Sequence, residues 1–478
     1  MKFNLMMSMF IDREQERTAL EQRWTTGQAE LLIVYGRRRV GKTELLLQFA
    51  RHAAKRYLYF LATQGTQAEQ LRQFSEILRQ TFQDPLLRTL TFSDWNTVFT
   101  YLGQQARQER LLVILDEFPY LCEAAPELPS IIQRFWDLEG QHSQLFLVLC
   151  GSQLGFMERE VLGERSPLYG RRTGQLRLQP LDFRAAAQFF PGYGPRERLL
   201  AYGMLGGMPA YLRRFSPALS LRENLLRELL DVQGYLYEEP RFLLRMELRD
   251  VRVYASMLGA IASGCTRLNE IAQRVGVPVH TASKYLSVLQ ELALIVREVP
   301  FTARAPQRSK RGRYRILDPF LRFWYRFVYP HATLIEAGQG RLVYERFIAP
   351  QLDTYMGSIF EEVVRTYLER YAARELGLPP VVRTGRIWSG DFDVDLVAEH
   401  VDGSWTIGEC KWARRPVGLR VLTVLLQRHK QLGQMIRLPK RIRYLVASGG
   451  GFSPAFLRQQ RDEILLLDLN DLLSASEM

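Results

Sequence analysis

The sequence has little cysteine and histidine and no long apolar run. Its 478 residues include four cysteines and six histidines, which are widely spaced and form no CxxC pair. This spacing argues against a disulfide scaffold or a zinc site, and reduced thiols are expected. No apolar stretch approaches the roughly 18 to 20 residues of a membrane span. The few residues before Asp12 are too short for a secretory leader, so we expect a cytoplasmic protein with no membrane partner.

Composition describes a large, basic, globular chain. Hydrophobic residues make up 47% of the sequence, which is enough for ample cores. At about 150 residues per domain, the length predicts several domains. Lysine and arginine total 64 against 51 acidic residues, a formal net charge of +13. Such a charge attracts polyanions such as nucleic acid, although a solvated basic surface is the plainer alternative.

A glycine-bounded loop lies between an apolar run at 31–35 and a predicted helix that begins near residue 44. Strand, loop and helix start form the context that a nucleotide-binding P-loop requires, since backbone N–H groups and the helix N-terminus then face the phosphates. Lys42 is expected to reach the β- and γ-phosphates and Thr43 to hold Mg²⁺. The predicted ATP-binding residues are Gly36, Arg37, Arg38, Arg39, Val40, Gly41, Lys42, Thr43 and Glu44. A chance glycine-rich turn is the alternative.

Two further apolar runs end in polar residues, as parallel strands do where they meet a ligand crevice. The run at 111–115 ends in Asp116 and Glu117. Asp116 is predicted as the carboxylate on the Mg²⁺ side and Glu117 as the base that activates water. The run at 145–150 is followed by Ser152 and Gln153, either of which could sense the γ-phosphate. Three correctly ordered strands make a chance P-loop pattern a poor explanation.

The loop at 166–173 carries the adjacent arginines Arg171 and Arg172. Either could stabilise transition-state charge on the nucleotide of a neighbouring subunit, which implies a homo-oligomer and makes a hexamer one candidate assembly. Ordinary surface charge is an equally good explanation. Short amphipathic segments after Pro180 are expected to form a helical lid over the nucleotide.

A helix, a turn and a second helix are predicted over residues 268–292, followed by a wing strand near 294–299. The second helix carries His280, Thr281, Ser283 and Lys284 near its start, where a recognition helix faces DNA. The wing adds a basic cluster that comprises Arg304, Arg308, Lys310, Arg311, Arg313 and Arg315. This pattern favours DNA as a partner, although a winged helix also serves for packing between domains. The arginine-aromatic segment at 318–330 is typical of a packed interdomain helix rather than a base-stacking surface.

The last third of the chain contains a second set of catalytic candidates. A helix carries Glu361, one strand carries Asp395, and the next strand carries Glu409 and Lys411 on one face. Adjacent strands would bring Asp395 and Glu409 together as Mg²⁺ ligands beside Lys411, an arrangement suited to phosphodiester hydrolysis. Alternating charges on an exposed sheet are the alternative, and the order of elements favours a nuclease-type fold.

These motifs together resemble the archaeal-type P-loop ATPases of the AAA+ and STAND-related class over most of the chain. The resemblance rests on 10–14, 35–43, 116–118, 167–172 and 206–212, and the segment at 318–330 resembles a domain commonly attached to these ATPases. Asp395, Glu409 and Lys411 match the PD-(D/E)XK nuclease pattern. The resemblance implies ATP binding and hydrolysis, with DNA-linked roles in many members. The lid shows no arginine of the sensor 2 kind.

The sequence therefore predicts an α/β P-loop ATPase, AAA+-like with a parallel sheet, at 1–180, followed by a helical lid at 181–240. A winged-helix domain with an aromatic linker is expected at 241–330 and a restriction-endonuclease-like α/β domain at 331–478. The leading hypothesis is an ATPase that binds DNA and cleaves it with Mg²⁺. The alternative is a regulatory ATPase switch whose winged helix binds DNA or protein and whose nuclease-like domain is inactive. A protein remodeller is the weakest reading, because no aromatic pore loop is identifiable.

Overall fold

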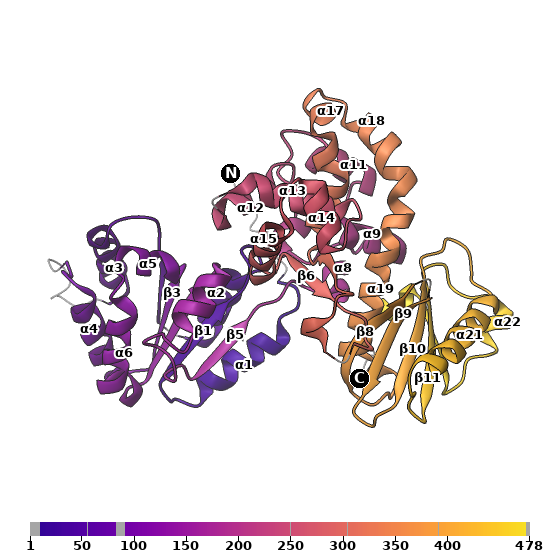
Figure 1. The fold of residues 1–478 in the computed structure, drawn as a ribbon. Helices are drawn as coiled ribbons and strands as arrows, with labels where there is room; N and C mark the ends of the chain where they lie inside the picture. The colour runs from indigo at the N-terminus through magenta and orange to yellow at the C-terminus, as the bar shows by residue number, and fades with distance from the viewer. Residues whose placement is uncertain are drawn as a thin grey trace. The chain divides into compact units, whose positions relative to one another are not determined.

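The computed structural model describes residues 10–54, 56–82, 91–248, 250–303, 305–390 and 392–474 (Figure 1). Its internal contacts divide the chain into two units. The first unit contains residues 1–180 together with 208–210, and the second contains 181–207 and 211–478. Within the described residues, no helix is both long and apolar enough to cross a membrane.

The first unit is built on a five-stranded parallel sheet in the order β2-β3-β4-β1-β5. Its strands are β1 (Glu30–Tyr35), β2 (Tyr57–Leu61), β3 (Leu111–Asp116), β4 (Leu145–Gly151) and β5 (Gly174–Arg177). All residues of β1, β3 and β4 are buried, which explains why their sequences are continuous apolar runs rather than alternating ones. The α/β class with a parallel sheet is thereby confirmed.

Helices connect these strands and cover the sheet. They are α1 (Glu14–Thr25), α2 (Lys42–Ala53), α3 (Gln67–Thr81), α4 (Trp95–Gln108), α5 (Phe118–Ala124) and α6 (Leu128–Leu138), with the short α7 (Leu154–Phe156) after β4. Thr66 and Asp94 cap α3 and α4 by accepting a backbone N–H from the first turn of each helix. Because the strands are parallel, the carboxyl ends of β1, β3 and β4 meet at one edge of the sheet, where the predicted nucleotide residues lie.

The second unit begins with helices. They are α8 (Phe183–Ala187), α9 (Pro195–Leu205), α11 (Leu221–Glu228), α12 (Glu239–Glu247), α13 (Val251–Ala262), α14 (Leu268–Val275) and α15 (Val279–Glu291). A two-stranded antiparallel sheet of β6 (Ile295–Glu298) and β7 (Arg313–Ile316) follows α15. Gly276 ends α14 with a φ of 76°, a left-handed conformation that favours glycine and produces the turn into α15.

An aromatic helical segment leads from β7 to the C-terminal part. Its helices are α16 (Pro319–Phe323), a π-helical stretch (Trp324–Val328), α17 (Ala332–Glu336) and α18 (Gly340–Val343). Phe320, Phe323, Trp324 and Phe327 are fully or almost fully buried. This agrees with the expectation of a packed helix rather than a base-stacking surface.

The C-terminal part contains a mixed five-stranded sheet in the order β12-β11-β10-β9-β8. The pairs β8–β9 and β9–β10 are antiparallel, and the pairs β10–β11 and β11–β12 are parallel. The strands are β8 (Val381–Ser389), β9 (Phe392–His400), β10 (Trp405–Lys411), β11 (Ile442–Ser448) and β12 (Ile464–Leu467). The helices are α19 (Leu352–Arg370), α20 (Ala372–Glu375), α21 (Arg420–Met435), α22 (Pro454–Leu457) and α23 (Leu469–Leu473). In Figure 1, α19 and α21 lie on opposite sides of this sheet.

Candidate functional site

The loop between β1 and α2 has the backbone shape of a phosphate-binding loop. Gly36 has a φ of 156°, and a side chain there would bring its Cβ to 2.5 Å from the carbonyl oxygen of Leu178. Gly41 has a φ of 97° and directly precedes the first helical residue, Lys42. Both glycines are therefore needed for the turn, and the positive end of α2 starts where phosphates are expected.

Lys42 and Thr43 lie where the sequence placed them, at the start of α2. The Lys42 ammonium is buried and donates to the carbonyl oxygens of Gly36 at 2.9 Å and Arg37 at 3.2 Å. Burial lowers the pKa of Lys42. The Thr43 hydroxyl donates to a carboxylate oxygen of Asp116 at 2.7 Å, and the Tyr59 hydroxyl donates to the same oxygen at 3.0 Å. The structure thus brings the predicted Mg²⁺-side hydroxyl and carboxylate together.

Glu117 and Ser152 also meet. The Ser152 hydroxyl lies 2.8 Å and 3.0 Å from the two carboxylate oxygens of Glu117. Glu117 itself has a φ of 53°, which is uncommon for a residue other than glycine and is often found at functional positions. One of the two residues predicted to sense the γ-phosphate, Ser152, therefore contacts the residue predicted to activate water.

Arg13, just before α1, contacts the phosphate-binding loop through its side chain. It is 6% exposed, and its guanidinium donates to the carbonyl oxygens of Val40 at 3.0 Å and Gln179 at 2.7 Å. A further ion pair to Glu16 at 3.0 Å completes its contacts. Arg13 thus connects the phosphate-binding loop with the segment that follows β5, a role that the sequence analysis did not identify.

The two arginines proposed to act in trans differ in their surroundings. Arg171 forms a bidentate pair with Asp137 at 2.8–3.0 Å and also donates to the carbonyl oxygens of Pro167 and Tyr169. Arg172 donates to the carbonyl oxygen of Leu162 at 3.4 Å, which is a weak hydrogen bond. Arg172 is therefore the more easily released of the two.

The second unit assembles the other predicted set. Asp395 lies on β9, and Glu409 and Lys411 lie on the neighbouring antiparallel strand β10. The backbone N–H of Cys410 donates to Asp395 at 3.0 Å. One Glu409 oxygen pairs with Lys411 and the other with Arg428 from α21. Burial and, second, the neighbouring Glu409 carboxylate raise the pKa of Asp395.

Glu361 approaches this cluster from α19. It pairs with Arg386 of β8 at 3.1 Å, and Arg386 also contacts Asp393 at 3.3 Å. Burial, followed by repulsion from Asp395 and Asp393, raises the pKa of Glu361 to about 7, and Arg386 opposes this rise. Among the residues that the structure describes, no group of three or more histidine, cysteine, aspartate or glutamate side chains is placed to hold a metal ion.

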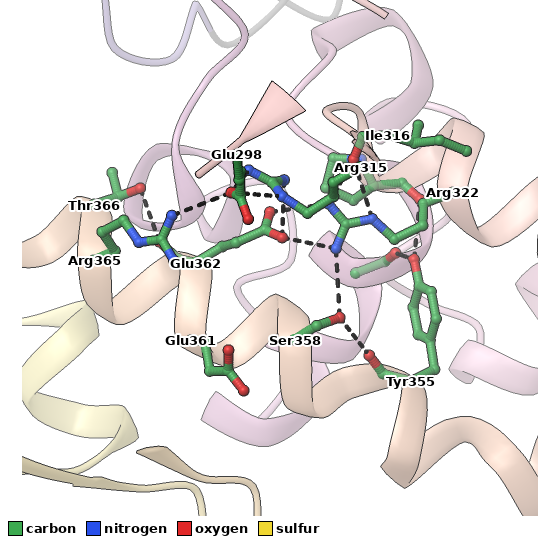
Figure 2. A network of polar contacts seen from close by, with 12 residues as sticks. Glu298, Arg315, Ile316, Arg322, Tyr355, Ser358, Glu361, Glu362, Arg365 and Thr366 are labelled. Carbon is green, nitrogen blue, oxygen red and sulfur yellow. Dashed lines mark hydrogen bonds and ion pairs between the residues drawn. The ribbon is translucent and has the colours of Figure 1, made fainter. Parts of the chain in front are cut away.

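A network of ion pairs fixes α19 against the two-stranded sheet (Figure 2). Glu362 pairs with Arg315 of β7 at 2.9 Å and with Arg322 of α16 at 2.8 Å. Glu298 of β6 pairs with Arg315 at 2.8 Å and with Arg365 of α19 at 3.4 Å. Burial alone would raise the pKa of Glu298, but Arg315 and Arg365 lower it overall. Figure 2 shows Glu361 on the same helix, outside the network.

Two arginines of the predicted basic wing already have contacts within the second unit. Arg315 lies inside this network, and the Arg313 guanidinium lies 4.9 Å from the centre of the Trp388 ring. Carboxylates and an aromatic ring of the same unit therefore already contact both side chains, and their contact with DNA stays a prediction. Arg308, Lys310 and Arg311 are exposed, and Arg304 lies outside the described residues. On α15, His280 and Lys284 are exposed, whereas Thr281 and Ser283 are half-buried.

Comparison with known proteins identifies the family of the nucleotide-binding region. A family described as an ATPase domain predominantly from Archaea matches residues 10–215. The chain is also 31% identical over 405 residues to the uncharacterized protein MJECL04 of Methanocaldococcus jannaschii, covering 84% of this chain and 88% of that protein. The chain belongs to the MJECL04 family and carries an archaeal-type P-loop ATPase domain. Its family membership covers both units, although the ATPase match covers the first unit and the start of the second.

The relatives of this ATPase leave its C-terminal part without an assigned role. Residues 324–423 match a family described as "Archaea bacterial proteins of unknown function". A solved structure, the Walker-type ATPase PABY2304 of Pyrococcus abyssi, is 23% identical with a TM-score of 0.50, covering 66% of this chain and 96% of that one. This likeness shows a shared P-loop ATPase fold.

Four residues at these sites were missed from the sequence: Arg13, Tyr59, Arg386 and Arg428. Each acts through a partner that is distant in sequence, so no local spacing marks it. Arg13 had one signal, because it lies within the segment at 10–14 that carries the family resemblance. Tyr59 lies between two buried residues of β2, so the strand pattern shows which face of the sheet its side chain is on but not which residue it contacts.

Proposed function

We propose that this ATPase binds DNA and cleaves it at a Mg²⁺-dependent site in its C-terminal part. The observation that carries the proposal is the meeting of Asp395, Glu409 and Lys411 on two adjacent strands, with Glu361 nearby on α19. An exposed charged sheet would leave these groups in solvent. Here Glu409 is 1% exposed and Asp395 is 9% exposed, and carboxylates are rarely buried to this extent unless a cation compensates their charge.

The donor set fits Mg²⁺. This ion favours oxygen ligands and is commonly bound by one or two carboxylates, with water and substrate phosphate completing its shell. Asp395 and Glu409 would hold it, and the bound ion would polarise a phosphodiester and lower the pKa of a bound water. Lys411 would neutralise negative charge that develops on the phosphate. Glu361, whose pKa is raised to about 7, is suited to exchange a proton near neutral pH.

The ATP half of the proposal uses the first unit. Lys42 would contact the phosphates, Thr43 and Asp116 would hold Mg²⁺, and Glu117 would activate water, with Ser152 orienting it. An arginine from a neighbouring subunit would complete the site in a homo-oligomer such as a hexamer. Arg172 is the better candidate, because Arg171 is engaged by Asp137.

The DNA-binding half uses α13 to α15 with β6 and β7 as a winged helix. The exposed start of α15, with His280 and Lys284, would enter a groove, and the outer wing with Arg308, Lys310 and Arg311 would contact phosphates. We retain the division into ATPase core, lid, winged helix and nuclease-like domain as part of this proposal. A DNA substrate is consistent with the expected cytoplasmic location.

The test is Mg²⁺-dependent cleavage of linear, circular and single-stranded DNA by the full chain, with and without ATP. Cleavage should be lost in Lys411→Ala and retained in Lys440→Ala, a matched exposed lysine of the same unit. Lys42→Ala should lose ATP hydrolysis, and its effect on cleavage would show whether ATP controls the nuclease. Cleavage that persists unchanged in Lys411→Ala would sink the proposal.

The second candidate is a regulatory ATPase switch with an inactive nuclease-like domain. It is favoured by the pairing of both Glu409 oxygens with Lys411 and Arg428, and by the lack of a three-ligand metal group among the described residues. ATP hydrolysis and DNA binding without cleavage of any substrate would support this candidate.

A further inference from the structure

The side chain of Arg428 forms an ion pair with Glu409, one of the two predicted metal ligands. It reaches from α21 to one oxygen of Glu409, while Lys411 contacts the other oxygen. Glu409 is 1% exposed, so its charge requires partners. Arg428 was absent from the sequence-based set, and it is the contribution of α21 to a site otherwise built from β9, β10 and α19.

The formal charges of the four groups balance. Asp395 and Glu409 are negative, and Lys411 and Arg428 are positive, so these four groups carry no net formal charge, and Glu361 with Arg386 adds a pair of opposite charges beside them. A divalent ion bound to both carboxylates would add two positive charges in a largely buried place. Electrostatics then favour either the departure of a cationic side chain or the arrival of a negative group, and a DNA phosphate supplies the latter.

Of the two cations, the Arg428 side chain is the one placed to move in this way. The side chain of Lys411 is 43% exposed and that of Arg428 is 27% exposed, whereas Glu409 is held within β10. A guanidinium on a helix at the solvent boundary loses little when it leaves one anion for another, and its planar donors suit two oxygens of a phosphate. Lys411 follows Glu409 on the same strand by two residues and stays beside it.

From this arrangement we propose that Arg428 competes with a divalent metal ion for Glu409 and transfers to a DNA phosphate when the metal binds. The inference rests on the proposed function, because it requires Asp395 and Glu409 to be metal ligands. Arg428 is then a positioning and phosphate-binding residue that keeps the site neutral until metal and DNA arrive together.

The first experiment titrates Mg²⁺ into the full chain without nucleotide and measures heat. The part of the signal that is lost in Glu409→Gln defines the site. Arg428→Gln should bind Mg²⁺ at this site roughly tenfold more tightly, since a competing cation is removed. Arg428→Met, which keeps the aliphatic stem, should do the same if Arg428→Gln fails to fold. Arg420→Gln, an exposed arginine on the same helix, should match the parent chain.

A merely structural role for Arg428 predicts the opposite result. Its removal would then weaken Mg²⁺ binding or leave it unchanged, and either result overturns the inference while leaving the metal site intact. If Glu409→Gln leaves the Mg²⁺ signal unchanged, the metal site itself is wrong, and the proposed cleavage function falls with it. The two failures are therefore distinguishable.

The second experiment measures duplex DNA binding in the Lys411→Ala background, so that cleavage does not consume the substrate. With Mg²⁺ present, adding Arg428→Gln should weaken binding and reduce the slope of log affinity against log salt by about 0.9, one phosphate contact. With a chelator present, Arg428 pairs with Glu409, and the same substitution should have little effect. An equal loss in both conditions would place Arg428 on the DNA surface permanently and overturn the competition.

Discussion

The two candidate sites are built in different ways. The nucleotide site is formed by one continuous segment, 36–44, with Asp116 and Glu117 added from the carboxyl end of β3. Its lysine is satisfied by backbone carbonyl oxygens and its carboxylate by hydroxyl groups. The carboxylate site takes side chains from α19, β8, β9, β10 and α21, and its charges are satisfied by arginines and a lysine.

This difference has a physical consequence. Backbone carbonyl oxygens are fixed parts of the chain, and those of Gly36, Val40 and Gln179 accept from Lys42 and Arg13, so the shape of the nucleotide loop is set by the backbone itself. Charged side chains can exchange partners, and the proposed response of the carboxylate site to metal and substrate depends on this property. The arrangement of the nucleotide site should therefore depend on local backbone geometry. The arrangement of the carboxylate site should depend on the contacts that fix α19 and α21 in position.

The largest expected effect tests the role of Glu117. Glu117→Gln keeps the size of the side chain and its contact with Ser152 but removes the base. We expect ATP turnover to fall by roughly 10²- to 10⁴-fold with nucleotide binding retained. Steady-state turnover and binding of a fluorescent nucleotide measure the two quantities. Glu123→Gln on α5, an exposed position, is the control, and undiminished turnover in Glu117→Gln would remove it as the base.

Much of the first unit could be predicted from the sequence, because its information is local. Continuous apolar runs predicted β1, β3 and β4, although not β2 and β5, and the glycines at 36 and 41 predicted the loop between β1 and α2. The contact of Ser152 with Glu117 was not predicted, since it depends on how two neighbouring strand ends meet. The contacts of Arg13 with residues 40 and 179 join segments that no spacing connects.

The second unit shows where this reasoning fails. Asp395, Glu409 and Lys411 could be placed together because adjacent strands with alternating faces fix their positions. Arginines could not be placed, because a long, flexible cation is compatible with both solvent and an internal carboxylate. Arg313 and Arg315 were expected in a DNA-binding wing, and their contacts with Trp388 and with two glutamates were not predicted. Arg428 and Arg386 had no signal at all.

A second, intermediate effect tests whether the ion network holds the carboxylate site. Glu362→Gln removes the partner shared by Arg315 and Arg322, of which Arg322 is 8% exposed. Uncompensated buried charge should lower the opening free energy of α19 by about 2 to 3 kcal/mol, measured by native-state hydrogen exchange. Glu345→Gln breaks an exposed pair with Arg222 and should change this energy by less than about 0.5 kcal/mol.

The same exchange data separate the two sites. Amides of α2 in the first unit should keep their protection in Glu362→Gln, because the nucleotide loop does not use this network. Equal losses in α2 and α19 would contradict the contrast drawn between the two sites. Unchanged protection in α19 would show that apolar packing, rather than the ion pairs, fixes this helix against the sheet.

The smallest expected effect concerns which face of the wing meets DNA. Replacing Arg308, Lys310 and Arg311 by glutamine removes exposed charge, and each lost phosphate contact should reduce the salt slope of duplex binding by about 0.9. Arg313→Gln is the matched control, because its guanidinium lies against Trp388 and should leave the slope unchanged. A slope that changes only in the control would mean that the inward arginine is released to DNA. The wing would then resemble the carboxylate site, in which cations exchange one partner for another, rather than the fixed nucleotide loop.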